Sequence, residues 1–271
     1  MPTATTHDIV IDAGQGRLFA RRWTPHAHDA RLAPVVLFHD SLGCVELWRD
    51  FPQRLAMATG RAVVAYDRLG FGRSDPHPGK LDIDFIDQEA RQDFRTVREA
   101  LGLGRFVALG HSVGGGMAVV CAVVHGESCD AVITESAQTF AEGHTLAGIR
   151  LAREAFAEPG QLERLKKYHG EKAAWVLNAW IDHWLSPEVA GWSLDGYLRD
   201  VRCPALALHG DQDEYGSLAH PRRIVELAGG RLVVLPACGH VPHREQPGQV
   251  LAEIAGWLSK PARTACGNQP S

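Results

Sequence analysis

The chain has 271 residues, of which 45% are hydrophobic and 22% charged, so it can bury a full core as one large domain or two small ones. Its formal net charge is −4 and its lysines and arginines are scattered, which argues against nucleic acid as a partner. The N-terminus lacks a signal-peptide pattern, and no window approaches the apolar length of a membrane span. We therefore expect a soluble cytoplasmic protein, whose oligomeric state the sequence does not indicate.

The predicted elements begin with two β-like segments and then alternate between strands and helices. Residues 7–12 and 17–23 flank Gly14-Gln15-Gly16, as the two strands of a hairpin would. Continuous apolar runs then predict strands buried on both faces, at residues 34–39, 61–66, 106–109, 131–134, 205–209 and 232–235. Helix-like stretches with apolar residues three and four apart lie at residues 48–59, 86–101, 115–124, 219–227 and 247–258. This order predicts an α/β fold, with helices on both faces of a mostly parallel sheet.

The alternation breaks once, between residues 137 and 195. That segment has no convincing strand, but its helix-like stretches hold four of the seven tryptophans: Trp175, Trp180, Trp184 and Trp192. The spacing places Trp180 and Trp184 on one helical face, with Trp175 some distance round the helix. These tryptophans either pack inside the segment or contact a substrate beneath it.

This break also suggests how the chain is divided. We expect residues 1–136 and 196–258 to form the core, and residues 137–195 to form a helical cap over it. Residues 259–271 are rich in turn formers and have no periodicity, so we expect a mobile tail there.

The most informative motif is Gly110-His111-Ser112-Val113-Gly114, which follows an apolar run and precedes a helix-like stretch. This pattern is typical of a nucleophile elbow, in which a serine sits on a sharp turn between strand and helix. Glycines two residues either side are needed because side chains there would collide with neighbouring backbone. The alternative is a glycine-rich connection without chemistry, since the pattern also occurs by chance.

Two residues much later in the sequence, a histidine and an aspartate, could activate this serine. A serine hydroxyl is a weak nucleophile, so it needs an adjacent base and a carboxylate that orients the base. His240 follows the last apolar strand, and Asp213 follows the strand at residues 205–209. Asp211 in the same loop and Glu135 at the end of another strand are the alternative acids.

These motifs together resemble the α/β-hydrolase family over residues 9–258. Besides the elbow, the matching segments are HDSLG at 39–43, DRLGFGRS at 67–74, HGDQD at 209–213, and Gly239-His240 followed by EQP at 245–247. The chain order of serine, acid and histidine is also that of the family. The resemblance implies that Ser112 is the nucleophile, His240 the base and Asp213 the acid. It further implies that the backbone N–H groups of Ser41 and Val113 form the oxyanion hole.

The family usually has His-Gly where this chain has His39-Asp40, so a carboxylate lies near the oxyanion loop. We expect Asp40 to point away and cap the turn, because a carboxylate aimed at a developing oxyanion would oppose it. The D-S-L-G run followed by Trp48 is similar to the loop of 3-oxoadipate enol-lactonases. This similarity favours a lactone or ester substrate. Cys44 follows the same loop and either lines the pocket or packs beside it.

Signals for a metal or a cofactor are weak. The six cysteines include no C-x-x-C pair, and Pro242 between His240 and His243 argues against a helix that presents both to one metal. The elbow glycines do not match the dinucleotide-binding pattern. We expect neither a metal nor a cofactor.

The predicted function is hydrolysis of a small-molecule carboxylic ester or lactone through an acyl-enzyme on Ser112. Three alternatives stay open, namely hydrolysis of a carbon–carbon bond in a vinylogous diketone, thioester hydrolysis, and ligand binding without catalysis on the same fold.

Overall fold

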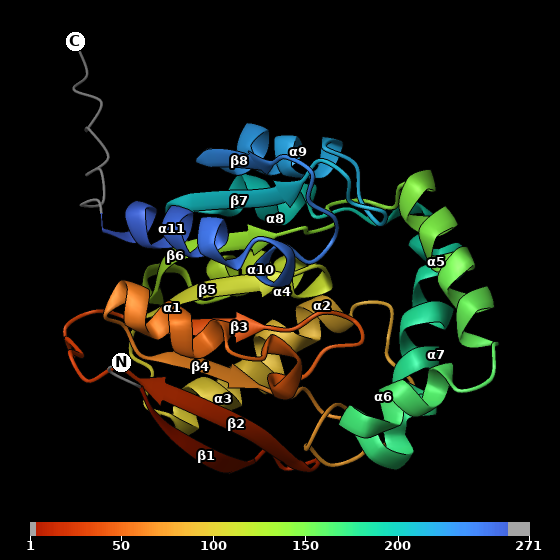
Figure 1. Cartoon of the computed structure of the whole chain (residues 1–271), viewed down its shortest axis with the longest axis horizontal. Coiled ribbons are helices and arrows are strands. Elements are labelled where there is room, and N and C mark those ends of the chain that lie inside the picture. Colours follow the sequence, from red (N-terminus) through yellow and green to blue (C-terminus); the bar gives the residue numbers. More distant parts are fainter. Residues whose placement is uncertain (1–3, 260–271) are drawn as a thin grey trace.

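A single sheet of eight strands runs through the computed structural model, which describes residues 4–259 (Figure 1). The strands are β1 (Thr5–Asp12), β2 (Arg17–Thr24), β3 (Val35–Phe38), β4 (Val63–Tyr66), β5 (Phe106–His111), β6 (Cys129–Glu135), β7 (Ala205–Gly210) and β8 (Arg231–Leu235). Their order across the sheet is β1-β2-β4-β3-β5-β6-β7-β8. The β1–β2 and β2–β4 pairs are antiparallel and every other pair is parallel. The expected mostly parallel sheet is therefore confirmed.

Helices cover both faces of this sheet, and each face has its own apolar core. On one face α1 (Phe51–Thr59) packs against α11 (Pro247–Leu258). The other face carries α3 (Phe94–Ala100), α4 (Val113–Val124), α8 (Asp195–Asp200) and α9 (Ala219–Ala228). The short α2 (Phe85–Gln88) and a π-helical turn (Glu89–Asp93) lead into α3, and α10 (Pro242–Glu245) precedes α11. Because the central strands are covered on both faces, their sequences are continuous apolar runs.

The segment between β6 and β7 is helical. It contains α5 (Gly143–Phe156), α6 (Gln161–His169), α7 (Ala173–Trp184) and a 3₁₀ turn (Pro187–Gly191). In Figure 1 the helices α5, α6 and α7 stand together at one end of the sheet. Among the described residues of this segment, the β pairing consists of one isolated bridge between Phe140 and Ser193. We refer to residues 137–195 as the helical insertion.

Hydrogen bonds attach the helical insertion to loops of the core. His169 at the end of α6 accepts from Gly72 N at Nδ1 (2.9 Å), and its Nε2 lies 3.0 Å from the carbonyl oxygen of Leu42. One ring nitrogen thus accepts and the other donates, which is the pattern of a neutral imidazole. Burial lowers the pKa of His169 and favours that neutral form. Near the start of the helical insertion, the Thr145 hydroxyl in α5 donates to the carbonyl oxygen of Tyr215 (2.7 Å).

The predicted tail lies almost wholly beyond the residues that the structure describes. Residues 260–271 of the predicted tail lie outside the described residues, as does Cys266. Within residues 4–259, no helix combines the length and the apolar character that crossing a bilayer requires.

Candidate active site

Ser112 occupies a strained turn between β5 and α4. Its backbone has φ 55° and ψ −126°, a region that residues other than glycine rarely adopt. A Cβ atom at Gly110 would lie 1.9 Å from the carbonyl oxygen of Gly114, and one at Gly114 would lie 2.1 Å from that of Phe38. Both glycines are therefore required by close backbone contacts. A strained backbone of this kind costs about 1–3 kcal/mol of stability. The buried elements on either side hold Ser112 in this conformation.

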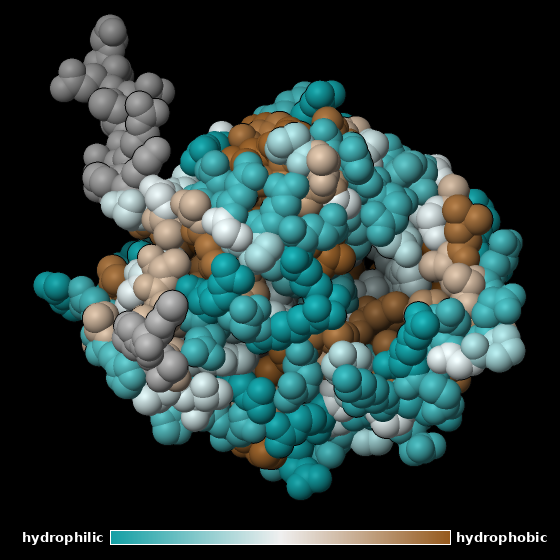
Figure 2. Space-filling model, viewed as in Figure 1, coloured by the Kyte–Doolittle hydropathy of each residue, from teal (hydrophilic) through white to brown (hydrophobic). Residues whose placement is uncertain are grey.

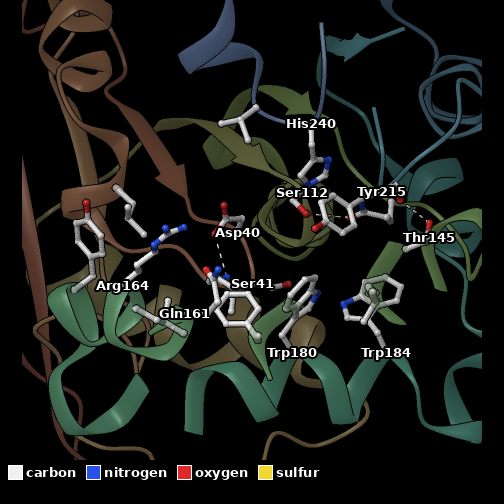
Figure 3. Close-up of a pocket in the computed structure, with 18 of the residues that line it drawn as sticks. Asp40, Ser41, Ser112, Thr145, Gln161, Arg164, Trp180, Trp184, Tyr215 and His240 are labelled. Atoms are coloured by element: carbon white, nitrogen blue, oxygen red, sulfur yellow. Dashed lines mark hydrogen bonds between the residues drawn. The ribbon is translucent and has the colours of Figure 1, made fainter. Parts of the chain in front are cut away.

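Asp213 and His240 meet beside this serine. His240 Nδ1 lies 2.8 Å from Asp213 Oδ1 and 2.9 Å from Oδ2. The backbone N–H groups of Tyr215 and Gly216 also donate to Asp213 Oδ1, at 2.8 and 3.1 Å. Burial opposes the charged form of Asp213, but the hydrogen bond from His240 and these further contacts hold its pKa below the usual value. In Figure 3 the His240 imidazole lies directly over Ser112.

The two alternative acids occupy other positions. Glu135 Oε2 lies 2.7 Å from His243 Nδ1, so this carboxylate pairs with a different histidine, and both side chains are buried. Asp211 is exposed at the end of β7. Of the three candidate acids, Asp213 is the one that the structure brings to His240.

The Ser112 hydroxyl is held by a residue that the sequence analysis did not select. Its Oγ donates to Gln138 Oε1 at 3.3 Å, and Gln138 is buried just beyond the end of β6. The signal was available, because polar residues after neighbouring parallel strands meet at one edge of the sheet. A hydroxyl that rotates away from Gln138 is free to donate toward His240, whose Nε2 is the ring nitrogen that Asp213 does not engage.

Two backbone N–H groups near Ser112 are free to bind an oxyanion. Val113 is the first residue of α4, where N–H groups have no partner within the helix. Ser41 belongs to the loop after β3 and lines the same cavity as Ser112. In the described part of the chain, neither N–H donates a hydrogen bond. Both residues predicted for the oxyanion hole thus keep an available donor.

Asp40 turns partly toward the site. Its Oδ1 accepts from Leu42 N at 3.1 Å, the turn-capping contact that we expected. However, Asp40 also lines the cavity, and its Oδ2 lies 3.3 Å from His111 Nδ1. Asp40 therefore caps the turn with one oxygen and faces His111 with the other, while its side chain borders the cavity.

His111 faces acceptors at both ring nitrogens. Nδ1 is close to Asp40 Oδ2, and Nε2 lies 2.8 Å from the carbonyl oxygen of His240. Both contacts are satisfied together when both nitrogens carry protons, so these surroundings favour the imidazolium form of His111. Burial opposes that charge, but the Asp40 contact raises the pKa of His111 above its usual value, and His111 in turn lowers the pKa of Asp40 despite burial. A buried ion pair thus joins the loop after β3, the elbow and the His240 loop.

A cluster behind the site has ligand atoms at metal-binding spacing. His111, Glu135 and His243 bring one potential ligand atom each within 4.8 Å of one another. The hydrogen bonds of His111 leave it no lone pair for a metal, and Glu135 is paired with His243. The arrangement fits a hydrogen-bonded network better than a metal centre. His240 and His243 have different partners, since His240 bonds Asp213 and His243 bonds Glu135.

The site opens into a cavity of about 390 Å³ between the core and the helical insertion. Figure 2 shows the hollow on this face of the molecule, with hydrophobic residues on its wall. Trp180 and Trp184 line this cavity together with Ser112 and His240. Trp175 lies on another side of α7, where it stacks on His77 and donates to the carbonyl oxygen of Gly79. The helical spacing placed these three tryptophans correctly.

Cys44 does not line the cavity. It is buried, and burial raises the pKa of its thiol to about 12, so it packs as a small hydrophobe.

The sequence analysis also missed polar residues of the cavity wall. Gln161, Arg164 and Tyr168 come from α6, and Arg244 comes from α10. The sequence signal for them is poor, because charged residues on an amphipathic helix are usually solvated.

The chain is similar to hydrolases of several named activities. A family model described as the alpha/beta hydrolase fold matches residues 33–190. The proline iminopeptidase of Lactobacillus delbrueckii subsp. bulgaricus is 25% identical over 277 residues, which covers 83% of this chain and 90% of that protein. The crystal structure of proline iminopeptidase from Mycobacterium smegmatis matches with a TM-score of 0.71 at 20% identity, covering 93% of this chain and 97% of that one. Est816, described as an enzyme that degrades N-acyl homoserine lactones, matches with a TM-score of 0.67 at 21% identity, covering 92% and 100%.

Proposed function

The chain belongs to the α/β-hydrolase fold family, and on that premise we propose that it hydrolyses a carboxylic ester or lactone through a Ser112, His240 and Asp213 triad. The observation that carries this proposal is the pairing of His240 with Asp213 (2.8 Å) beside a serine held in a strained elbow. A serine nucleophile needs a base that is itself oriented by an acid, and the His240 and Asp213 pair supports these roles.

The first half of the proposed reaction forms an acyl-enzyme. Ser112 Oγ attacks the acyl carbon while Nε2 of His240 takes the hydroxyl proton. The free N–H groups of Ser41 and Val113 receive the charge that develops on the carbonyl oxygen. Asp213 stabilises the imidazolium, and its three hydrogen bonds fix its direction. When the tetrahedral intermediate collapses, the alkoxy group takes the proton from His240 and leaves as an alcohol.

The second half restores the enzyme. A water molecule gives a proton to His240 and attacks the acyl carbon of the ester on Ser112. Collapse of the second intermediate releases the carboxylic acid and returns the proton to Ser112. For a lactone the alcohol and acid belong to one molecule, so the product is a hydroxy acid. The proposed reaction needs no metal or cofactor.

The charges of the cavity favour an ester or lactone over a peptide with a free amino terminus. Such a peptide needs a carboxylate to accept its ammonium group. Among the described residues that line the cavity, the carboxylate is Asp40, which is already paired with His111. The cavity lining also includes Arg164 and Arg244, which would repel a cation. This charge pattern supports an ester or lactone substrate over the reaction that the name of the peptidase relatives describes.

We further propose that residues 137–195 act as a cap that selects the substrate. Three helices of this segment contribute to the cavity wall, and Trp180 and Trp184 face the reacting groups from α7.

The test is a comparison of three substrates with purified protein. We expect turnover of p-nitrophenyl butyrate and of a γ- or δ-lactone, and at least about a hundredfold lower kcat/KM for proline p-nitroanilide. Preferred cleavage of the anilide would contradict the ester assignment. No turnover of any of the three, with no reaction between Ser112 and a fluorophosphonate, would indicate a ligand-binding protein.

A further inference from the structure

The cavity has two chemically different ends. In Figure 3 the labelled residues run from Gln161 and Arg164 at one end, past Ser112, to Tyr215 and Trp184 at the other. The second end carries the aromatic rings of Tyr215 and Trp184 beside Thr145, and Trp180 lies between the two ends, below Ser112. The first end holds a guanidinium group from the helical insertion. The reacting serine lies between the two.

Arg244 adds a second guanidinium to the wall from the core side. Its NH2 group donates to the carbonyl oxygen of Leu47 at 2.6 Å, in the turn that follows the oxyanion loop. Its Nε is buried and has no hydrogen-bond partner in the described part of the chain. A buried donor without an acceptor is unfavourable, because it has lost its hydrogen bonds to water. An acceptor supplied by a ligand would remove that cost.

These two guanidinium groups, one from the helical insertion and one from the core, form no ion pair with any described residue. Arg164 makes no ion pair or hydrogen bond with any described residue, and Arg244 makes no ion pair. Arg244 is close enough to Asp40 to help lower the pKa of that carboxyl, but the carboxylate is engaged by Leu42 N and His111. Among its described lining residues, the cavity therefore presents two guanidinium groups and a single carboxylate, which is already paired with His111.

We propose that the substrate is an ester or lactone that also carries a carboxylate, which binds Arg164 and Arg244 while the apolar part lies against Trp180 and Trp184. The inference rests on the proposed function and names its substrate class. A guanidinium offers a planar fork of N–H groups, and a carboxylate is the anion that matches this geometry. Gln161 and Tyr168 supply further polar groups at the same wall.

The position of Ser112 agrees with such a substrate. A molecule that spans the cavity would place its central carbonyl at the serine, with an anionic end toward α6 and an apolar end toward α7. Binding at both ends fixes the orientation of the carbonyl, so the anionic group should raise kcat/KM and not merely solubility.

The experiment compares two esters that differ at one end. p-Nitrophenyl hexanoate and mono-p-nitrophenyl adipate have acyl chains of equal length, ending in a methyl group and a carboxylate respectively. We expect the wild-type protein to have at least about a tenfold higher kcat/KM for the adipate, the size of one charge-assisted hydrogen bond. A ratio near one, or below one, would overturn the inference.

Variants show whether the arginines cause this preference. Arg164→Gln should reduce the adipate-to-hexanoate ratio about tenfold, and Arg164→Lys should recover part of it by restoring the charge. Arg150→Gln is the matched control, because Arg150 is exposed on α5 and does not line the cavity. Arg150→Gln should keep the wild-type ratio. Equal ratios in the Arg164→Gln and Arg150→Gln proteins would contradict the assignment.

Arg244→Gln also removes a donor to Leu47, so its thermal melt is measured beside its kinetics. A reduced adipate-to-hexanoate ratio in folded Arg244→Gln protein supports the inference. An unchanged ratio removes Arg244 from it and contradicts the proposal of two arginines.

A p-nitrophenyl ester that ends in a phosphate is a further test substrate, and a clear preference for it over the adipate would overturn the carboxylate assignment. Hydrolysis of the hexanoate with a ratio of one refutes this inference alone. If neither carboxylic ester is hydrolysed, the proposed function fails and the inference fails with it.

Discussion

The two walls of the cavity are built in different ways. On the core wall, Asp213 is fixed by contacts from His240, Tyr215 and Gly216, and Ser112 is fixed by close packing of the elbow backbone. On the wall from the helical insertion, Arg164 is exposed and Trp180 is only half-buried, with an edge contact to Tyr215. One wall is held by many directional contacts and the other by few.

This difference assigns different tasks to the two walls. Proton transfer and oxyanion binding need groups placed within a fraction of an ångström, which multiple buried hydrogen bonds provide. Selecting a substrate needs shape and charge, which less constrained side chains can supply. We therefore expect core substitutions to change kcat strongly, and substitutions on the insertion wall to change KM and substrate preference.

The largest effect is expected for Ser112→Ala. Removing the nucleophile should lower kcat by roughly a thousandfold to a millionfold, because triad residues act as a unit. The melting temperature should stay close to that of the wild type, since the change removes one hydroxyl that makes a single long contact with Gln138. Ester kinetics and a thermal melt provide the measurement. A normally folded variant with a tenth of wild-type activity would rule out the serine mechanism.

Asp213→Asn should cause the next largest loss of kcat. An amide in place of this carboxylate favours the wrong imidazole tautomer, and such a change costs about 10⁴ in kcat. Asp211→Asn is the matched control, since Asp211 is in the same loop but exposed, and it should lose less than about twofold.

Glu135→Gln completes this comparison. It disturbs the buried pair with His243, so it should lower the melting temperature while the folded protein retains most of its activity. A greater activity loss in Glu135→Gln than in Asp213→Asn would show that the acid is on the other strand.

Asp40→Asn tests the ion pair that joins the elbow to the oxyanion loop. Asp40 has a lowered pKa, so its contribution to stability is present above its ordinary value of 3.8 and is lost as pH falls. His111 has a raised pKa, so its contribution is present below its ordinary value of 6.5 and is lost as pH rises through the raised value. The pair should therefore stabilise the fold most between those two values.

Urea unfolding of both proteins measures this effect. We expect Asp40→Asn to lower the free energy of unfolding by about 2 kcal/mol near pH 5.5, because it leaves a buried imidazolium without its anion. The difference should shrink at higher pH, once the pH passes the raised pKa of His111 and the imidazole loses its proton. An equal or larger difference at the higher pH would contradict the imidazolium assignment.

The smallest effect is expected on the insertion wall. Trp180→Ala should raise KM for apolar esters about tenfold with a small change in melting temperature, because Trp180 is half-buried and lines the cavity. Trp184 is buried against Trp192, so Trp184→Ala should also lower the melting temperature. Trp175→Ala is the control, because Trp175 faces His77 and not the site. If Trp175→Ala and Trp180→Ala shift KM equally, the cavity face of α7 does not bind the substrate.

The sequence was most informative where local rules decide the structure. Strands buried on both faces must be continuous apolar runs, so all six predicted parallel-sheet segments correspond to strands of the sheet. The elbow was recognisable because its glycines are demanded by the local backbone. The helix predicted from residue 48 begins instead at Phe51, since Arg49, with φ 54°, separates it from a 3₁₀ turn at Val45–Trp48.

Residues whose role depends on distant contacts were harder to find. Gln138 reaches Ser112 across 26 positions, and the Asp40 to His111 pair spans two strands. Arg164 has the sequence environment of an ordinary exposed helix residue, and only the fold places it on the cavity wall. Sequence patterns report local geometry, whereas these residues are defined by how β3, β5, β6 and α6 come together.

The most direct test of the account is to identify the residue that a fluorophosphonate probe modifies. The probe reacts with an activated serine and stays attached, so peptide mass spectrometry can locate it. We predict a single adduct on Ser112, slower labelling of the Asp213→Asn protein, and labelling of Trp180→Ala at the wild-type rate or close to it, because the core wall sets the reactivity. No adduct on Ser112, or labelling that depends on Trp180 more than on Asp213, would contradict the division of tasks between the two walls.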